Sequence, residues 1–147
     1  MSIDDDVALL ERVPTLRLLG SASLRMLAIG SELRNYGQGD VLFNAGDEAD
    51  AGYVVQRGAF RIDDGAGAEM TVGPGALLGE LALVHPMRRP STATAMEYST
   101  AIRINRSLFQ RVLESDPAAA LRLRDEFVAR TSQIASDILI AGGKLST

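Results

Sequence analysis

The residues that could do chemistry in this 147-residue chain gather in one segment, from Gly79 to Ser91. Within it, Glu80 to Val84 is long enough for one helical turn, which begins after a glycine and stops before Pro86. A helix start presents backbone N–H groups without internal partners, and Arg89 follows closely enough to add a bidentate charged fork. Because the Glu80 carboxylate cannot bind an anion, we expect it to accept a hydrogen bond from a sugar hydroxyl. An anion site beside a sugar site is typical of a nucleotide pocket.

Short apolar runs separated by glycine-bearing turns surround this segment between residues 33 and 104. Each run has the length of a strand, and the turns contain glycine together with aspartate or asparagine. The predicted strands are 41–43, 53–55, 60–62, 70–72 and 101–104. No run is followed by a helix long enough for a parallel crossover. The pattern therefore predicts an antiparallel, jelly-roll-like β-roll with one short helix inside it.

Apolar residues recur at helical spacing before and after the roll, over residues 4–32 and 105–141. Residues suited to cap helix starts stand at the expected places, namely Ser21 or Ser23, Asn105 and Asp116. We therefore predict one α+β domain over residues 1–147, with helices at both ends of the roll.

The last predicted helix runs from about Pro117 to Ala141 and ends at Gly142. Its apolar residues fall on two seams, the first with Leu123, Phe127, Ile134 and Ile138, the second with Leu121, Val128, Ala135 and Leu139. A helix that is apolar on two sides has more surface to bury than one small roll can cover. We therefore expect the helix to act as a movable lid or to pair with a second copy of the chain.

Composition excludes several classes of protein. With Lys+Arg 15 against Asp+Glu 19, the net charge of −4 gives no positive field for nucleic acid. Zero cysteine and the single His85 exclude thiol chemistry and multi-histidine metal sites. The acidic opening Asp4–Asp6 does not resemble a secretory signal, and no run approaches 18 apolar residues. We expect a cytoplasmic protein with no metal, no nucleic-acid partner and no membrane partner.

The segment Gly79-Glu80-Leu81-Ala82-Leu83, followed by Arg89 and Ser91-Thr92-Ala93, resembles the phosphate-binding cassette of the cyclic-nucleotide-binding domain family. Members of this family include cAMP-dependent kinase regulatory subunits, the catabolite activator protein and cyclic-nucleotide-gated channels. The turns over 37–46 and 53–58 also resemble the family's preceding turns, so the likeness covers nearly the whole chain.

The resemblance implies a role for each matching residue. Arg89 binds the cyclic phosphate and Glu80 binds the ribose 2′-hydroxyl. Backbone at the pocket floor comes from Gly79, Leu81 and Ala82. The last helix closes over the base, with Ile138, Leu139 or Ile140 as the candidate cap.

One position departs from the family pattern. After the arginine, the family usually has Ser, Ala or Thr with a backbone N–H for the phosphate, whereas Pro90 has none. The loss of one charge-assisted donor costs about 1.5–3 kcal/mol unless Ser91 replaces it. Threonine at this position is frequent in cGMP-preferring members, so the resemblance implies a mild preference for cAMP.

These observations favour a non-catalytic cAMP sensor, with cAMP or cGMP as its ligand and no resident cofactor. Its last helix is expected to signal in trans to an effector protein that the sequence does not identify, or through a homodimer. Two alternatives stay open: a ligand-free scaffold of the same fold, which Pro90 suggests, and a cupin-like enzyme. The lone His85 and the absence of cysteine disfavour the enzyme.

Overall fold

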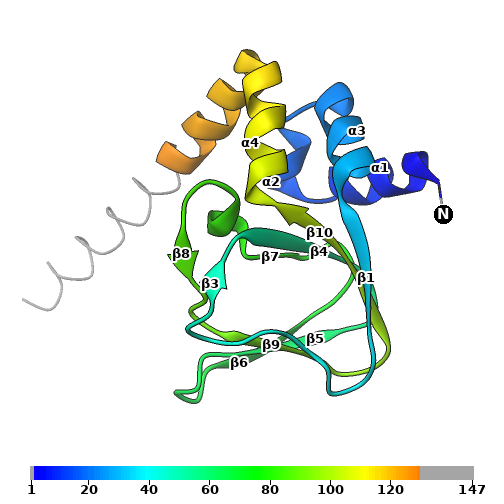
Figure 1. Cartoon of the computed structure of the whole chain (residues 1–147), viewed down its shortest axis with the longest axis vertical. Coiled ribbons are helices and arrows are strands. Elements are labelled where there is room, and N and C mark those ends of the chain that lie inside the picture. The colour runs from blue at the N-terminus through cyan, green and yellow to red at the C-terminus, as the bar shows by residue number, and fades with distance from the viewer. Residues whose placement is uncertain (1, 130–147) are drawn as a thin grey trace, which may run out of the picture.

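Helices occupy both ends of the described chain and pack together on one end of a β-roll (Figure 1). A computed structural model describes residues 2–129 of the protein. Its helices are α1 (Ile3–Glu11), α2 (Pro14–Arg17), α3 (Ser21–Gly30), the 3₁₀ helix η1 (Glu80–Leu83) and α4 (Arg106–Ser115), and residues 117–129 are also helical. None of the helices within residues 2–129 is long and apolar enough to cross a membrane.

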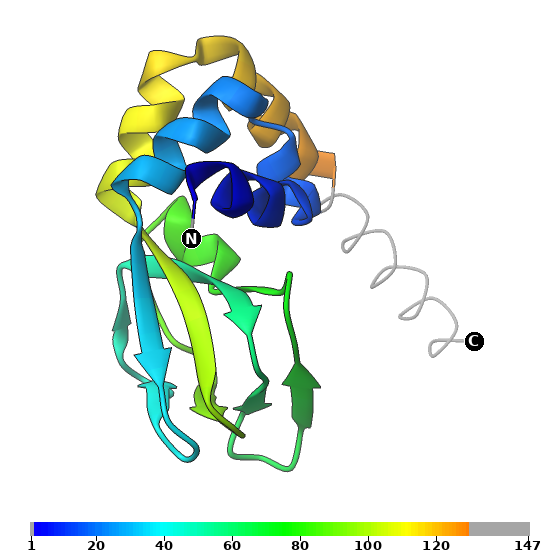
Figure 2. The ribbon, with the colours of Figure 1, turned by 90° about the vertical axis from the view of Figure 1, so that its right-hand side faces the viewer.

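The strands form two four-stranded antiparallel sheets and a two-stranded ribbon, ordered β1-β10-β4-β7, β2-β9-β5-β6 and β3-β8. Their bounds are β1 (Glu32–Tyr36), β2 (Val41–Phe43), β3 (Glu48–Ala49), β4 (Ala51–Arg57), β5 (Phe60–Asp63), β6 (Glu69–Val72), β7 (Leu77–Leu78), β8 (Met87–Arg88), β9 (Thr92–Ala95) and β10 (Ser99–Asn105). The two larger sheets face each other across the roll (Figures 1 and 2). The predicted antiparallel roll with a short internal helix is confirmed.

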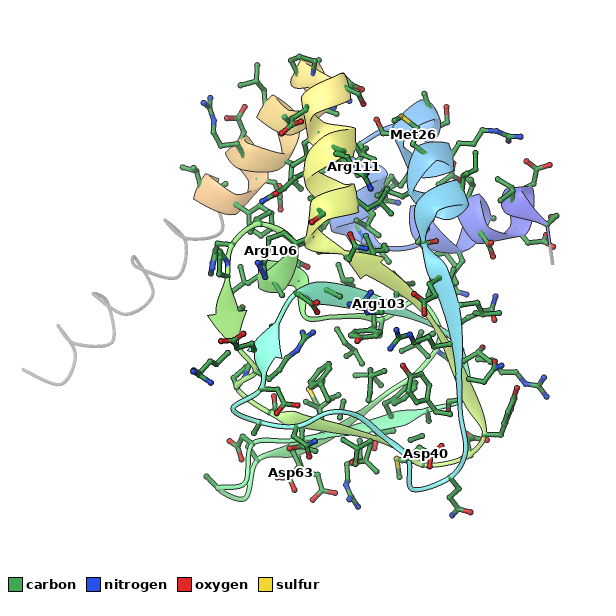
Figure 3. All side chains as sticks on the ribbon, in the orientation of Figure 1. Met26, Asp40, Asp63, Arg103, Arg106 and Arg111 are labelled. Atoms are coloured by element: carbon green, nitrogen blue, oxygen red, sulfur yellow. The ribbon has the colours of Figure 1, made fainter. Side chains whose placement is uncertain are left out.

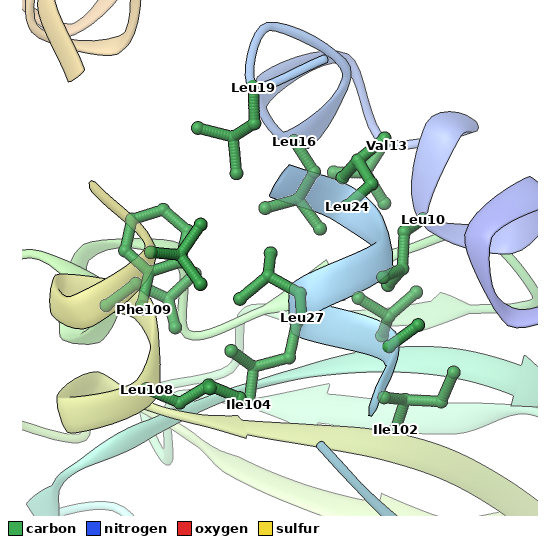
Figure 4. Packing of buried hydrophobic residues seen from close by; sticks show 14 of the residues in the cluster. Leu10, Val13, Leu16, Leu19, Leu24, Leu27, Ile102, Ile104, Leu108 and Phe109 are labelled. Atoms are coloured by element: carbon green, nitrogen blue, oxygen red, sulfur yellow. The ribbon is translucent and has the colours of Figure 1, made fainter. Parts of the chain in front are cut away.

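Strand β4 separates two hydrophobic clusters, because successive side chains of a strand point to opposite faces. Val54 is fully buried against the helices, together with Ile102 and Ile104 of the neighbouring β10. Figure 4 shows this cluster, the helix-side cluster, in which Leu27 and Phe109 pack over the sheet. Tyr53, Val55 and Ala101 belong to the second cluster, inside the roll. The sheet thus carries the helices on one face and encloses the roll with the other.

Two of the three predicted helix caps are confirmed. The Asn105 side chain accepts from Leu108 N at 2.7 Å, and Asp116 Oδ1 accepts from Ala119 N at 3.2 Å. The prediction for α3 is wrong, because this helix begins at Ser21 with Gly20 as its N-cap and no side-chain cap bond. The other candidate, Ser23, donates its hydroxyl to Asp116 Oδ2 at 3.4 Å. It therefore joins α3 to the C-terminal helices.

Five of the ten strands were missed. Three of them, β3, β7 and β8, are only two residues long, and the other two, β1 and β9, carry no strong apolar pattern. β1 begins at Glu32, inside the range 4–32 that was expected to be helical. Its first four residues are exposed, so they contain no run of buried side chains. β9 reads Thr-Ala-Thr-Ala, in which only the small alanines are buried. A strand of this kind is held by its ladder partners and not by large apolar side chains.

The helix over residues 117–129 shows both predicted seams. Leu123 is only 2% exposed and the partly buried Phe127 packs against the helix-side cluster, so the described part of the first seam packs against the domain itself. On the second seam, Leu121 is 50% exposed and Val128 is 58% exposed. The rest of both seams, the predicted end of the helix at Ala141 and the candidate caps Ile138, Leu139 and Ile140 lie outside the described residues.

Candidate functional site

A pocket of about 340 Å³ opens between the roll and η1. Strands β2, β5, β6 and β7 supply apolar walls, and the chain from Gly79 to Ser91 supplies the polar groups. The lining residues are Phe43, Ile62, Met70, Val72, Ala76, Leu77, Leu78, Gly79, Glu80, Leu81, Met87, Arg89, Pro90 and Ser91. A concave, mostly apolar site with a few convergent polar groups is typical of a small-molecule pocket.

Arg89 is the polar residue held most deeply in this pocket. It is 5% exposed, and its Nη2 donates to the carbonyl oxygen of Ala51 at 2.8 Å. The guanidinium carbon lies 4.2 Å from the ring centre of Phe43 and 5.7 Å from that of Tyr53. These aromatic faces and the carbonyl hold the cation by cation–π attraction and one hydrogen bond. The side chain is thus fixed before any ligand arrives.

The remaining donors of Arg89 lack partners among residues 2–129. Both Nε and Nη1 are buried, and neither makes a hydrogen bond there. Burial lowers the pKa of the Arg89 guanidinium from its ordinary value, although an arginine stays protonated in proteins. A buried cation with unused N–H groups carries a desolvation cost, which hydrogen bonds to a bound anion would offset. The geometry therefore fits a bound oxyanion that accepts charge-assisted hydrogen bonds from this guanidinium.

Gly79 leaves room for that guanidinium. It is the N-cap of η1 in the left-handed conformation, with φ +77°. A Cβ atom at this position would collide with Arg89 Nη1 and lie 3.1 Å from the carbonyl oxygen of Ala51. Both the backbone conformation and the close approach of Arg89 therefore require glycine here.

Glu80, the first residue of η1, also lines the pocket. The hydroxyl of Thr15, in α2, donates to Glu80 Oε2 at 3.2 Å. The carboxylate and the Arg89 guanidinium thus belong to one cavity.

The structure brings most of the predicted site residues together. Leu81 is 47% exposed, and it lines the pocket together with Pro90 and Ser91. Ala82 does not line it: this residue of η1 is fully buried, and its carbonyl accepts from Arg106 Nε at 2.9 Å. Arg106, at the start of α4, also bonds the carbonyl of Ala49 and so ties η1 to β3 (Figure 3).

The sequence pattern gave no indication of the apolar walls or of Thr15. Phe43, Ile62 and Val72 were predicted as strand residues, but nothing in their spacing showed that they face the same cavity as Arg89. The signal that could have indicated Phe43 is its aromatic side chain in a strand next to a predicted turn. Thr15 stands 65 residues from Glu80 and carries no local signal.

Comparison with known families fits this geometry. The sequence model described as "Cyclic nucleotide-binding domain" matches residues 33–116, more than half of the chain. This range contains the whole pocket and η1. The chain therefore belongs to the cyclic nucleotide-binding domain family.

Individual relatives agree with this assignment. The chain is 32% identical over 112 residues to the "cAMP-dependent protein kinase regulatory subunit" of Eremothecium gossypii, which covers 75% of the chain and 24% of that protein. It is 27% identical over 111 residues to "Lysophospholipase nte1" of Emericella nidulans, which covers 72% of the chain and 7% of that protein. The chain thus spans at most about a quarter of the length of these relatives.

Solved structures show the same fold. A "Cyclic nucleotide-binding-like protein" from Brucella abortus is 36% identical with a TM-score of 0.68, over 76% of this chain and 99% of that one. The N-terminal domain of a transcriptional regulator from Streptomyces coelicolor is 29% identical with a TM-score of 0.77, over 89% of this chain and 94% of that one. The Thermus thermophilus catabolite activator protein is 25% identical with a TM-score of 0.69, over 88% of this chain and 63% of that one.

Proposed function

We propose that this chain binds one cyclic nucleotide in the pocket that Arg89 and Glu80 share. Arg89 binds the cyclic phosphate through its guanidinium, and Glu80 accepts from the ribose 2′-hydroxyl. Gly79, Leu81 and Ser91 complete the floor around η1. The observation that carries the proposal is the buried Arg89, whose two nitrogens have no partner among residues 2–129 while its position is fixed by Ala51, Phe43 and Tyr53.

Within this proposal, cAMP is the preferred ligand over cGMP. Apart from Glu80, Arg89 and Ser91, the described lining residues have apolar side chains or none. Such walls favour adenine, which has fewer polar groups on its six-membered ring than guanine and so loses less hydration on burial. Pro90, which has no hydroxyl for guanine, supports the same order.

A thermal-shift experiment tests this proposal. A ligand that binds only the folded state, at 100 times its dissociation constant, stabilises it by about 2.7 kcal/mol. For a chain of this length we expect cAMP to raise Tm by about 5–10 °C, with a smaller rise for cGMP and for 5′-AMP at equal concentration. An unchanged Tm with millimolar cAMP would contradict the proposal.

Replacing Pro90 with alanine is expected to tighten cAMP binding. Pro90 is exposed and lines the pocket, and alanine at this position would restore the missing backbone N–H. One more charge-assisted donor gives a gain of about 10-fold to 100-fold in affinity. Titration calorimetry on both proteins measures the change.

Pro86→Ala is the matched control for Pro90→Ala, because Pro86 is also exposed but does not line the pocket. A weaker complex of Pro90→Ala with cAMP would mean that the site is adapted to proline. If only Pro90→Ala bound cAMP, and the natural sequence did not, the ligand-free scaffold would replace the sensor as the preferred function.

We also propose that ligand binding is signalled in trans, to another protein molecule that binds the exposed seam of Leu121 and Val128. These side chains lie on the helix that the family resemblance predicts to close over the base. The partner we favour is a second copy of the chain. Leu121→Asp together with Val128→Asp is expected to convert a dimer to a monomer in sedimentation velocity. Val41→Asp, at a residue 45% exposed on β2, is the control. Equal sedimentation of all three proteins would contradict self-association through this seam.

The proposed role is binding without catalysis, in the cytoplasm. Zero cysteine is consistent with a reducing compartment. Conversion of the cyclic nucleotide to a 5′-nucleotide during incubation with the protein would contradict the absence of catalysis. Recovery of the protein in a membrane or secreted fraction would contradict the cytoplasmic location.

A further inference from the structure

A hydrogen bond joins the N-terminal helices to the pocket. Thr15 lies in α2, which is only four residues long, and its hydroxyl donates to Glu80 Oε2 at 3.2 Å. The two residues are 65 positions apart in the sequence. This contact therefore exists only because the helices pack on the roll next to η1.

The direction of the bond is fixed by chemistry. A carboxylate only accepts, so the single hydroxyl hydrogen of Thr15 must point toward Glu80. Thr15 is 6% exposed, and a buried hydroxyl needs a partner. Threonine in a helix commonly bonds a carbonyl one turn earlier, whereas here the hydroxyl donates out of the helix. The contact thus connects a buried donor to a functional acid.

Helix α2 is a rigid support for this donor. Val13 and Leu16, on either side of Thr15 in sequence, are 3% and 0% exposed in the helix-side cluster. Just before α2, Arg12 Nη2 donates to the carbonyl oxygen of Pro74 at 3.5 Å. The same guanidinium lies against Gly75, where a Cβ atom would be 3.4 Å from it. The hydrogen bond from Arg12 links the segment before α2 to the turn that precedes Ala76, a residue of the pocket wall.

We propose that Thr15 is a positioning residue for ribose recognition, an inference that rests on the proposed function. A carboxylate offers about four acceptor sites, so Glu80 can keep the bond from Thr15 and accept the ribose 2′-hydroxyl as well. A free glutamate side chain loses much rotamer freedom when it is fixed. The bond from Thr15 fixes the Glu80 side chain when the protein folds, so this side-chain entropy is not lost again when the ligand binds. The ligand then binds to a carboxylate that is already oriented.

The test compares two ligands on one variant. Thr15→Val keeps the side-chain volume but removes the donor. It is expected to weaken cAMP binding by about 3-fold to 10-fold, the value of one hydrogen bond. Binding of 2′-deoxy-cAMP, which has no hydroxyl for Glu80, is expected to stay unchanged. Thr15→Ser, which keeps the donor, is expected to restore the natural ratio between the two ligands.

A matched control separates this role from packing. Thr100 is also 6% exposed, and its hydroxyl donates to Gln56 Oε1 at 2.8 Å, but neither residue lines the pocket. Thr100→Val is expected to lower the free energy of unfolding without changing the affinity ratio. Circular dichroism verifies that each variant folds. If Thr15→Val does not fold, Thr15→Cys, a weaker donor of similar size, is expected to change the ratio in the same direction.

The outcomes are distinguishable. Equal weakening of both ligands by Thr15→Val, or no change in either, would overturn the positioning role and leave the proposed function intact. Failure of the natural sequence to bind either nucleotide would overturn the proposed function, and this inference with it.

Discussion

Arg89→Met is expected to weaken cyclic-nucleotide binding strongly while leaving the ligand-free fold at least as stable. Removing one partner of a buried, charged contact costs about 2–5 kcal/mol, a loss of about 30-fold to 4,000-fold in affinity. The side chain is 5% exposed with two unpaired nitrogens among residues 2–129, so methionine also relieves a desolvation cost. Its thioether is suited to the site between Phe43 and Tyr53.

Titration calorimetry with cAMP and urea unfolding of the ligand-free proteins measure both parts of this prediction. Arg88→Met is the matched control, because Arg88 is the neighbouring arginine, is exposed and does not line the pocket. Its Nη1 donates to the carbonyl oxygen of Gly46 at 3.0 Å instead. If Arg89→Met bound cAMP as tightly as Arg88→Met, the phosphate would have to lie elsewhere.

Gly79→Ala is expected to lower both the stability of the protein and its affinity for cAMP. The φ of +77° strains any residue with a Cβ atom, by about 1–3 kcal/mol. The added methyl also collides with Arg89 Nη1 and comes within 3.1 Å of the carbonyl oxygen of Ala51, so the guanidinium must move from its place. The effect on affinity follows from that displacement, because the phosphate donors move with the guanidinium.

Gly39→Ala isolates the strain from the collision. Gly39 has φ +87°, and nothing lies within 4 Å of a Cβ atom built there. Urea unfolding and cAMP titration measure the loss of stability and of affinity in each variant. The difference between the losses in Gly79→Ala and in Gly39→Ala reports the collision alone. In the double variant Gly79→Ala with Arg89→Met the collision partner is absent, so part of the lost stability is expected to return. Indistinguishable effects of Gly79→Ala and Gly39→Ala would show that Arg89 is not held against Gly79.

The sequence predicted those parts of the site that are local in the chain. Gly79, Glu80 and Arg89 lie within eleven residues, so their order alone indicated a glycine-started turn with an acid and a cation beside it. The caps Asn105 and Asp116 were also predictable, since a cap bonds a backbone N–H three residues away. The α3 start was not, because Gly20 provides its cap position without a side chain.

The remaining parts depend on register and packing, which no short window contains. Phe43 stacks on Arg89 because β2 pairs with β9, a strand whose sequence carries little signal. Ile62 and Met70 face each other because β5 and β6 pair in that register, and a shift by one residue would turn both from the pocket. Thr15 reaches Glu80 only through the packing of α2 on the helix-side cluster.

The most direct test of the central claim is calorimetric titration of the natural sequence with cAMP, beside cGMP and 5′-AMP. The account predicts one cAMP bound per chain, cGMP bound more weakly, and 5′-AMP bound most weakly, because the site that Arg89 and Glu80 frame is proposed to fit a cyclic phosphate fused to the ribose. The absence of heat with cAMP at millimolar concentration, or a stronger response to 5′-AMP than to cAMP, would contradict it.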